Sequence, residues 1–317
     1  MIRCRQIVGV KIGKLLVICS VCILMLIIVS NFYNPNQLQF DENIHNLPLI
    51  FVGGHQSSGT GLLRILLDIH PMVRCGPEPI VTREILSIRW KTTFQKAMLS
   101  QSGISQNILD DAIAGFIVSI LKNMGPPAER LCHKDPSSYI FLRDLSELFP
   151  KAKFIHAIRD GRGAIMSTIV RQINPAYKSN EIPQALKHWE GFTSQILNDC
   201  KYVGRNRCMT VRYECLVLNP KREIQKILDF LDLPWDDRLL NHEKFVNNTS
   251  MLNKYEASSV QVVKAIHKES LDAWAKENSI IPKHLITTLH KNSSLLTKLK
   301  YTYPPNYEKL CEVELEL

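Results

Sequence analysis

A loop rich in glycine, serine and threonine near the start of the chain is the segment whose residue types most directly suggest chemistry. It spans residues 53–61 and follows the apolar run 49–52, and leucine and isoleucine recur at helical spacing after it. A strand, loop and helix in this order expose unpaired backbone N–H groups at the helix N-terminus, where the helix dipole also favours an anion. We therefore expect a phosphate or sulfate group to bind at Ser57, Ser58, Gly59 and Thr60.

The loop alone leaves a second interpretation open, because a turn of this composition can simply connect a strand to a helix. It lacks the lysine of the G-x-x-x-x-G-K-[ST] pattern, which disfavours an ATPase or GTPase of the common type. A phosphate-bearing ligand of another kind is then required.

A second segment with anion-binding residues favours the binding interpretation. Arg159 comes directly after the apolar run 154–158, and Ser167 lies one or two helical turns further on. An arginine and a hydroxyl in these positions are expected to clamp a phosphate. Taken singly, an arginine at a strand end is more often a solvated charge. Two anion sites on one sheet fit a nucleotide with two phosphates.

The elements that must position these residues alternate between strand and helix. Strands are predicted at 49–52, 154–158 and 208–213. Helices are predicted at 164–170, along the apolar face from Ala185 to Leu197, and after Asn219-Pro220. In the last of these helices, Asn219 is expected to be the N-terminal cap and Pro220 the first helical residue. This alternation predicts an α/β domain with a parallel sheet flanked by helices. In such a sheet the ligand binds beyond the carboxyl ends of the strands.

The overall composition is that of a globular protein. The chain has 317 residues, of which 45% are hydrophobic and 22% charged, enough for one large domain or two small ones. Its formal net charge of +9 suggests acidic partners, and nucleic acid, an anionic membrane surface and an anionic substrate would each suit it. Cys19 and Cys22 lie within the apolar N-terminal run, and outside that run no CxxC pair and no His/Cys cluster with metal-ligand spacing occurs in the sequence, so a metal site is not expected.

An apolar segment near the N-terminus predicts a membrane anchor. No charged residue occurs between Lys14 and Asp41, and basic residues precede the apolar run. The positive-inside rule then places the short N-terminus in the cytosol and the rest of the chain in the lumen. The predicted segments are a cytosolic tail at 1–14, a transmembrane signal anchor at 15–33, a stem at 34–46 and a lumenal domain at 47–317. A cleaved signal peptide is the competing interpretation.

A lumenal address also permits disulfides and glycosylation. Cys200 and Cys208 bracket a short turn before a predicted strand, which suits a local bridge. Sequons at Asn247, Asn248 and Asn292 agree with lumenal exposure.

Several separate blocks of the sequence, in the right order, resemble the tyrosylprotein sulfotransferases. These blocks are Phe51-Val52-Gly53-Gly54 with Ser58-Gly59-Thr60, His70-Pro71, Cys75-Gly76 with Glu78, Leu131-Cys132-His133-Lys134-Asp135-Pro136, Leu148-Phe149-Pro150, Arg159-Asp160-Gly161-Arg162, Cys200 and Cys208, Tyr213-Glu214, and Pro304-Pro305-Asn306-Tyr307. The resemblance spans about residues 47–307. It implies the sulfotransferase fold with a P-loop-like strand, loop and helix, and a Golgi enzyme that transfers sulfate from 3′-phosphoadenosine 5′-phosphosulfate to protein tyrosines.

The resemblance also implies roles for three residues in the transfer. Glu78 would be the general base that takes the proton from the acceptor hydroxyl, Lys134 would stabilise charge on the sulfuryl group and the leaving phosphate oxygen, and Ser258 would lie near the sulfuryl group. A phenol with a pKa of about 10 is a weak nucleophile at neutral pH, so a nearby carboxylate helps, while sulfuryl oxygens need positive charge. Without the resemblance, Glu78 reads as a loop carboxylate and Lys134 as a surface lysine.

For the nucleotide, the resemblance implies that Arg159 and Ser167 bind the 3′-phosphate and that Tyr213 lies near it. It also implies two disulfides and two free cysteines: Cys75 pairs with Cys132, Cys200 pairs with Cys208, and Cys215 and Cys311 remain unpaired.

Three positions depart from the family pattern. The family loop carries an arginine that assists catalysis, whereas this chain has Ser57. A second family arginine, which holds the substrate, is Ile80 here, and a lysine expected beside Trp274 is Ala273. Loss of one charged stabiliser commonly costs roughly 10² to 10³ in rate. The candidates to replace the missing charge are His55 and Arg64.

Two functions are compatible with this pattern. The first is an active type II Golgi membrane enzyme that sulfates tyrosines with acidic flanks in secreted or membrane proteins, with a preference altered by Ile80. The alternative is a catalytically impaired lumenal binding protein that retains the sulfotransferase fold. A carbohydrate sulfotransferase is disfavoured, because the blocks around Cys75, Lys134 and Cys200 resemble the tyrosine enzymes specifically. A homodimer is expected from the family tendency, and no nucleic-acid partner is expected.

Overall fold

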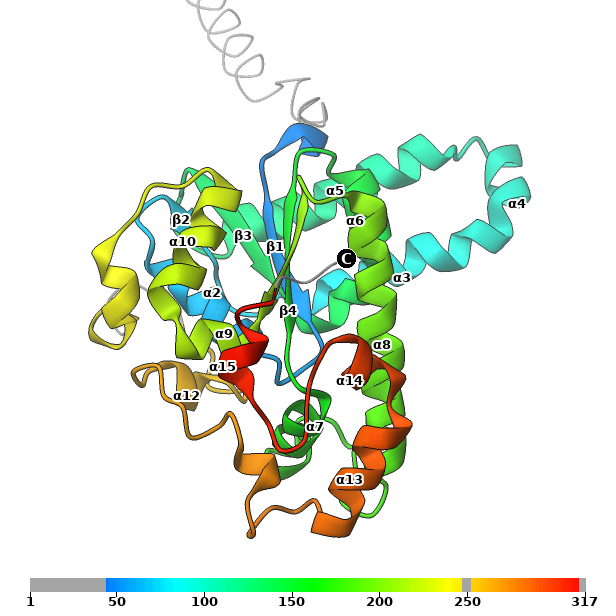
Figure 1. Cartoon of the computed structure of the whole chain (residues 1–317). Helices are drawn as coiled ribbons and strands as arrows, with labels where there is room; N and C mark the ends of the chain where they lie inside the picture. Colours follow the sequence, from blue (N-terminus) through cyan, green and yellow to red (C-terminus); the bar gives the residue numbers. More distant parts are fainter. Residues whose placement is uncertain (1–43, 247–251, 314–317) are drawn as a thin grey trace, which may run out of the picture. The chain divides into compact units, whose positions relative to one another are not determined.

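A parallel β-sheet forms the centre of the molecule (Figure 1). The computed structural model describes residues 44–246 and 252–313, which belong to one compact unit. Within these residues the sheet has five strands in the order β2-β3-β1-β4-β5, and every pairing is parallel. The strands are β1 (Ile50–Gly54), β2 (Val73–Arg74), β3 (Arg130–Lys134), β4 (Lys153–Ile158) and β5 (Cys208–Arg212). The predicted α/β fold with a parallel sheet is confirmed.

Strand β1 lies between β3 and β4 and is buried along its whole length. Its register pairs Val52 with Lys134 on one side and with Ile155 on the other. Because all strands run in the same direction, their carboxyl ends meet at one edge of the sheet. The loops that follow β1, β3, β4 and β5 therefore converge there.

Helices cover both faces of the sheet. In Figure 1, α2, α9 and α10 lie on one side, and α5, α6 and α8 lie on the other. The helices are α2 (Thr60–Ile69), α3 (Val81–Thr92), α4 (Lys96–Gln101), α5 (Gln106–Asn123), α6 (Leu142–Leu148), α7 (Gly161–Val170), α8 (Ile182–Val203), α9 (Tyr213–Leu218), α10 (Pro220–Leu231), α12 (Ser259–Val262), α13 (Lys283–Asn292), α14 (Ser294–Lys298) and α15 (Tyr307–Leu310). Short 3-10 helices are η2 (Ile44–Asn46), η3 (Thr93–Gln95), η4 (Pro136–Phe141), η5 (Asp237–Lys244) and η6 (Ala273–Ala275).

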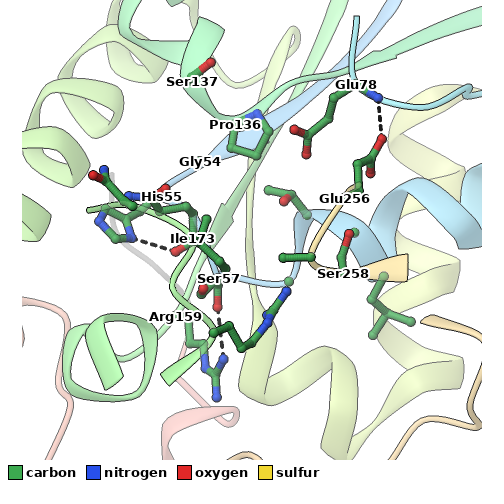
Figure 2. A pocket seen from close by; sticks show the side chains of 18 of the residues that line it. Gly54, His55, Ser57, Glu78, Pro136, Ser137, Arg159, Ile173, Glu256 and Ser258 are labelled. Atoms are coloured by element: carbon green, nitrogen blue, oxygen red, sulfur yellow. Dashed lines mark hydrogen bonds between the residues drawn. The ribbon is translucent and has the colours of Figure 1, made fainter. Parts of the chain in front are cut away.

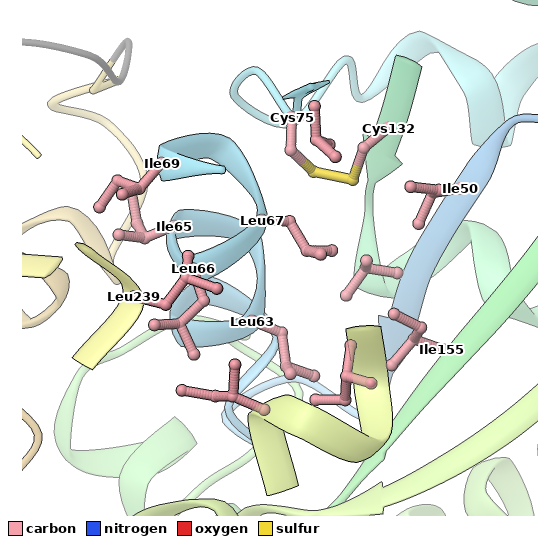
Figure 3. Close-up of a cluster of buried hydrophobic side chains, with 14 of the residues drawn as sticks. Ile50, Leu63, Ile65, Leu66, Leu67, Ile69, Cys75, Cys132, Ile155 and Leu239 are labelled. Atoms are coloured by element: carbon pink, nitrogen blue, oxygen red, sulfur yellow. A yellow bond between two sulfur atoms is a disulfide. The ribbon is translucent and has the colours of Figure 1, made fainter. Parts of the chain in front are cut away.

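The hydrophobic core holds the anion-binding loop against the sheet. Figure 3 shows Leu63 and Leu67 of helix α2 packed toward Ile50 and Ile155 of the central strands, whereas Leu66 lies beside Leu239. Such buried aliphatic side chains each contribute roughly 1.5–3 kcal/mol relative to exposure. The start of α2 is thereby fixed at the carboxyl end of β1.

Most of the predicted N-terminal segments lie outside the described residues, as do the sequons at Asn247 and Asn248. Ile44, which the sequence assigned to the stem, begins the short helix η2, and its side chain is buried in the core. His45 contacts the carbonyl of Leu148 at 2.7 Å, so this end of the stem packs against the domain. Among the described helices, none is both long and apolar enough to cross a bilayer.

One detail of the predicted helices differs in the structure. Pro220 occupies the first turn of α10 as predicted, but the side chain of Asn219 makes no capping hydrogen bond. The residue before the helix has φ −132° and ψ 61°, and it also ends the preceding helix α9. Asn219 is therefore both the C-terminal cap position of α9 and the N-terminal cap position of α10.

Candidate active site

A cavity of about 1120 Å³ opens at the carboxyl edge of the sheet (Figure 2). The residues that line it come from every loop that converges there. Among them are Ser57, Gly59 and Thr60 after β1, Glu78, Asp135 after β3, Arg159 after β4, Arg171, Tyr213 after β5, and Glu256 and Ser258 from the C-terminal part of the chain. The structure therefore brings the loop after β1 and Arg159 to the same cavity.

The loop after β1 has the backbone shape of an anion site. Gly59 immediately precedes helix α2 and has φ 94°, in the left-handed region that favours glycine. A Cβ atom at this position would lie 2.4 Å from a ring carbon of Tyr213. Gly59 has no side chain to cap α2, so the first N–H groups of the helix remain for a ligand.

Ser258 lies directly over the start of the same helix. A Cβ atom added to Gly61 would come within 2.7 Å of the Ser258 Cβ and 2.9 Å of its hydroxyl oxygen. The small residue at 61 thus permits the close approach of Ser258 to the first turn of α2. Ser258 lies on the cavity side of this contact, as Figure 2 shows.

Ser58 and Thr60, two of the predicted loop residues, differ in their exposure to the cavity. Thr60 lines it, whereas Ser58 is buried behind it. The hydroxyl of Ser58 has no hydrogen-bond partner among the described residues.

Arg159 is fixed at one end of the cavity. Its guanidinium donates to the carbonyl of Ser57 at 3.0 Å and to the carbonyl of Ser270 at 2.6 Å. The guanidinium carbon also lies 4.6 Å from the ring centroid of Tyr213, whose hydroxyl contacts Ser270 Oγ at 2.7 Å. The arginine is therefore held in one orientation against the loop.

A second arginine shares this end of the cavity. Burial and the positive charge of Arg159 lower the pKa of Arg171 below its usual range. Arg171 donates to Ser167 Oγ at 3.4 Å, and among the described residues no carboxylate forms an ion pair with either arginine. Ser167 itself stands outside the residues that line the cavity, and it reaches the site through Arg171. Two cations that repel each other favour an anion between them.

Glu78 and Lys134 form an ion pair beside the cavity. Lys134 Nζ donates to Glu78 Oε1 at 2.5 Å and to Glu256 Oε2 at 2.8 Å. Its side chain is only 1% exposed, whereas both carboxylates line the cavity. In Figure 2, Glu78 and Glu256 lie together on one side, and Ser57 and Arg159 lie on the other.

The environment of Glu78 suits a proton acceptor. Burial raises the pKa of its carboxyl above the ordinary range, although the adjacent Lys134 opposes this change. The negative charges of Glu256 and Asp135 raise this pKa further. A carboxylate whose pKa lies closer to neutrality accepts a proton from a hydroxyl more readily.

The local sequence explains why Lys134 lies at the carboxyl edge of the sheet. Lys134 is the last residue of β3, and Asp135 follows as the cap of η4, where its side chain accepts from the N–H of Ser137 at 2.9 Å. Pro136 occupies the first turn of η4. Strand β3 therefore ends abruptly, with its last side chain at the edge where the cavity opens.

Neither candidate for the missing loop charge supplies it. Burial lowers the pKa of His55 to about 4, so its imidazole is neutral at pH 7. It contacts the hydroxyl of Tyr177 at 2.7 Å instead. Arg64 donates to the carbonyl of Cys75 at 2.7 Å and lies 3.6 Å from the carboxylate of Asp68. The guanidinium of Arg64 therefore contacts Asp68 and the segment that precedes Glu78.

The other two departures lie at different places. Ile80 lines the cavity and is 69% exposed, so it forms part of the rim beside Glu78. Ala273 begins η6, next to Trp274, which is buried and lies 3.9 Å from the guanidinium of Arg162. Ala273 does not belong to the residues that line the cavity.

The structure contains three disulfides among the described residues. Cys75 is bonded to Cys132 and Cys200 to Cys208, as the resemblance implied (Figure 3 shows the first). The prediction that Cys215 and Cys311 remain unpaired is wrong, because a third disulfide joins them across 96 residues. No spacing pattern predicts this pair, since α9 and α15 meet only in the folded chain.

Among the cavity residues that sequence reasoning missed are Arg171 and Glu256. Arg171 directly follows helix α7, one turn after Ser167, so a search for a second cation on that helix would have found it. Glu256 comes from an irregular segment just before α12, and only the fold brings it to Lys134.

Comparison with known proteins places the chain in a family. Residues 48–237 match the sulfotransferase family. The chain is 38% identical over 285 residues to protein-tyrosine sulfotransferase of Drosophila melanogaster, covering 87% of this chain and 56% of that protein. It is also 38% identical over 286 residues to protein-tyrosine sulfotransferase A of Caenorhabditis elegans, covering 88% and 74%. It thus spans just over half the length of the fly protein.

A solved structure agrees in fold. The sulfotransferase domain of the Synechococcus PCC 7002 olefin synthase superposes with a TM-score of 0.52 at 22% identity, and the match covers 78% of this chain and 94% of that domain. The family match covers more than half of the chain, and the C. elegans relative is similar over most of both proteins. The chain therefore belongs to the sulfotransferase family and, within it, to the protein-tyrosine sulfotransferases.

Proposed function

We propose that this protein transfers a sulfuryl group from 3′-phosphoadenosine 5′-phosphosulfate to tyrosine hydroxyls of proteins. One observation carries the proposal: the Glu78–Lys134 pair borders the same cavity as the loop after β1 and Arg159. A proton acceptor, a buried cation and an anion-binding loop are the three components that sulfuryl transfer to a phenol requires. The protein-tyrosine sulfotransferases of fly and worm, at 38% identity, support the choice of tyrosine as acceptor.

The cavity fits a nucleotide with phosphates at two places. Arg159 and Arg171 offer guanidinium groups at one end, where burial and the positive charge of Arg159 lower the pKa of Arg171. The uncapped first turn of α2 offers backbone N–H groups at Gly59 and Thr60. We infer that the arginines hold the 3′-phosphate and that the loop holds the phosphosulfate.

The residues of the chain divide the chemistry between them. When bound, the donor supplies the sulfuryl group, whose bond to a phosphate oxygen breaks as the bond to the phenol oxygen forms. Glu78 takes the phenol proton, so the attacking oxygen gains electron density. Lys134 lies within hydrogen-bond distance of Glu78 and stabilises negative charge that develops beside it. Ser258, over the first turn of α2, adds a hydroxyl donor near the same point.

A specific observation favours the second candidate function, a binding protein with impaired catalysis. Ser57 stands where the family resemblance implies an arginine, and the neutral imidazole of His55 does not replace its charge. The Glu78–Lys134 pair favours the enzyme over this candidate, because carboxyls whose pKa is shifted by burial and by a charged partner cluster in catalytic clefts.

Transfer of labelled sulfate tests the two candidates. The full chain, in detergent, is incubated with ³⁵S-labelled donor and an acidic peptide that contains one tyrosine, and the same peptide with phenylalanine serves as the control acceptor. We expect label on the tyrosine peptide only, and a loss of at least ~100-fold in Glu78→Gln, an isosteric variant that cannot accept the proton. Absence of label from the wild-type chain, together with retained nucleotide binding, would establish the binding protein instead.

We further propose that acidic residues beside the acceptor tyrosine contact the cationic side chains at the rim of the cavity. Arg83, Lys187 and Lys264 line it, and Arg83 lies one helical turn after Ile80 on helix α3. Arg83 then replaces the contact that Ile80 lacks. The Arg83→Ser variant should raise KM for an acidic peptide but not for a neutral one, and equal changes for both peptides would contradict this role.

We propose that the protein is a type II membrane protein of the Golgi. The support is the apolar run 15–29 with basic residues before it, and the three disulfides, which form in oxidising compartments. Protease protection of the C-terminal domain in sealed Golgi vesicles tests the orientation. Digestion of the domain without detergent would exclude it.

We also propose a homodimer, formed through the helical arm that α3 and α4 make with η3. Trp90, Phe94 and Met98 are 57%, 78% and 68% exposed on this arm. The rings of Trp90 and Phe94 lie 5.5 Å apart, and large apolar side chains that gather on a surface mark interaction sites. The triple variant with Ser at these positions should sediment as a monomer, and an unchanged sedimentation coefficient would exclude this surface.

A further inference from the structure

Glu256 forms a hydrogen bond with each of the two proposed catalytic residues, Lys134 and Glu78. Its Oε2 accepts from Lys134 Nζ at 2.8 Å, and its Oε1 accepts from the backbone N–H of Glu78 at 2.6 Å (Figure 2 shows the second). Its side chain is 10% exposed, so both contacts are shielded from water. One carboxylate therefore fixes the backbone that carries Glu78 and, at the same time, the amine of Lys134.

The segment that bears Glu78 depends on contacts of this kind. Glu78 lies in an irregular stretch between β2 and α3, where no ladder or helix holds its backbone. Arg64 holds the carbonyls of Cys75 and Gly76 in the same stretch, at 2.7 and 3.1 Å. The hydrogen bond to Glu256 completes this support at Glu78 itself, across 178 positions of the sequence.

The charge on Glu256 has a further consequence during the reaction. Before transfer, Lys134 is paired with two carboxylates. When Glu78 takes the phenol proton, its carboxylate becomes neutral and its attraction for Lys134 weakens. Glu256 then remains as the anion that holds the amine in place.

We propose that Glu256 is a positioning residue for sulfuryl transfer, which orients Glu78 through its backbone and retains Lys134 while Glu78 changes charge. This inference rests on the proposed function, since it assigns Glu78 and Lys134 to the transfer step. Glu256 touches neither acceptor nor donor in this role.

The proposal has a definite effect on the titration of Glu78. The charged groups that face Glu78 are Lys134, Glu256 and Asp135, with Arg64 behind them. Replacement of Glu256 by glutamine removes a negative charge and leaves Lys134 to donate to Glu78 alone. Both changes favour the ionised form of Glu78, so its pKa should fall. A weaker base should then lower kcat.

The experiment compares Glu256→Gln and Glu256→Ala with the wild-type chain. Glutamine retains an acceptor for the N–H of Glu78 but not the charge, whereas alanine removes both. We expect kcat to fall roughly 10- to 100-fold in each variant, with KM for the donor within about twofold of the wild-type value. The acid limb of the pH profile of kcat/KM should move to lower pH in Glu256→Gln. The control is Glu277→Gln, which removes a surface ion pair with Lys283 and should change nothing.

A second readout separates this inference from the proposed function. In protein labelled with ¹³C at glutamate carboxyls, the Glu78 resonance is identified by its absence in Glu78→Gln, and it is titrated in the wild-type chain and in Glu256→Gln. A lower apparent pKa of Glu78 in Glu256→Gln supports the inference, whether or not the wild-type chain transfers sulfate. Absence of sulfate transfer by the wild-type chain would contradict only the proposed function. Identical titrations of Glu78, with kcat unchanged, would overturn the role of Glu256.

Discussion

At the scale of single residues, the site is a set of charges that the fold separates into two groups. Arg159 and Arg171 stand at one end of the cavity, and Glu78, Lys134 and Glu256 stand at the other. The sequence resemblance implied three of these five residues, because the blocks around them are distinctive. Arg171 and Glu256 were not predicted, since a lone arginine or glutamate carries no spacing signal until its neighbours in space are known.

Ser57, which stands where the family carries an arginine, is expected to limit the rate of transfer. Ser57 O accepts from Arg159, and its hydroxyl accepts from Thr168 at 3.0 Å. An arginine here would place a second cation beside the loop and stabilise charge that develops on the donor. We expect Ser57→Arg to raise kcat at least ~10-fold, with Ser57→Lys as a control for charge without the planar fork. Equal or lower kcat in Ser57→Arg would mean that this site has adapted to serine.

At the scale of elements, the predictable parts of the fold were those with a periodic apolar pattern. Strands β1, β4 and β5 and helix α10 were found from such patterns. Strand β3 was not predicted, because its sequence Arg-Leu-Cys-His-Lys has few apolar residues although His133 and Lys134 are buried. Strand β2 has only two residues, too few for any periodicity. Strand β3 also carries the proposed catalytic residue Lys134. Functional sites are where a sequence most often departs from the apolar pattern of its secondary structure.

The start of helix α9 carries a buried carboxyl whose titration should affect stability. Glu214 accepts from the N–H of Asp160 at 2.8 Å and from the hydroxyl of Tyr301 at 3.2 Å. Burial raises the pKa of Glu214 to about 7. The folded state therefore retains the proton more tightly than the unfolded state, whose carboxyl has a pKa of about 4.3. The resulting stability is fully present below the unfolded pKa and is lost as pH rises through about 7.

The isosteric variant Glu214→Gln isolates this contribution. Its free energy of unfolding, minus that of the wild-type chain, should increase by roughly 3 kcal/mol between pH 4 and pH 8, because glutamine does not ionise. Urea titrations across this range measure the difference, and other titrating groups cancel in it. A difference that is independent of pH would show that Glu214 titrates normally in the folded protein.

At the scale of the whole molecule, the disulfides tie distant parts of the chain to the sheet. The bond between Cys215 and Cys311 joins α9, which begins at Tyr213, to the last described helix, α15. Tyr307 at the start of α15 donates to Asp160 Oδ2 at 3.2 Å, so the C-terminal segment also contacts the loop after β4. The end of the domain thus supports the segments after β4 and β5, which present Arg159 and Tyr213 to the cavity. Neither contact was visible in the sequence, because both depend on the path of the chain.

Removal of this third disulfide should destabilise the domain more than removal of the local one. The bond closes 96 residues, against 8 for Cys200 and Cys208. In the chain-entropy account, loops of these lengths differ by roughly 2 kcal/mol in stabilisation. The Cys215→Ala/Cys311→Ala variant should therefore unfold at lower urea concentration than Cys200→Ala/Cys208→Ala. The reverse order would indicate that native packing, not loop closure, determines the contribution.

The measurement that tests the central claim most directly is a crystal structure of the protein with 3′-phosphoadenosine 5′-phosphate and a tyrosine peptide. The account requires one nucleotide to contact both the first turn of helix α2 and the guanidinium of Arg159, with the phenol oxygen within hydrogen-bond distance of Glu78. The expected result is a single nucleotide in the cavity at the carboxyl edge of the sheet, with one phosphate between Arg159 and Arg171 and the other at Gly59 and Thr60. A nucleotide that reaches only one of these two places, or a tyrosine bound away from Glu78, would contradict the account.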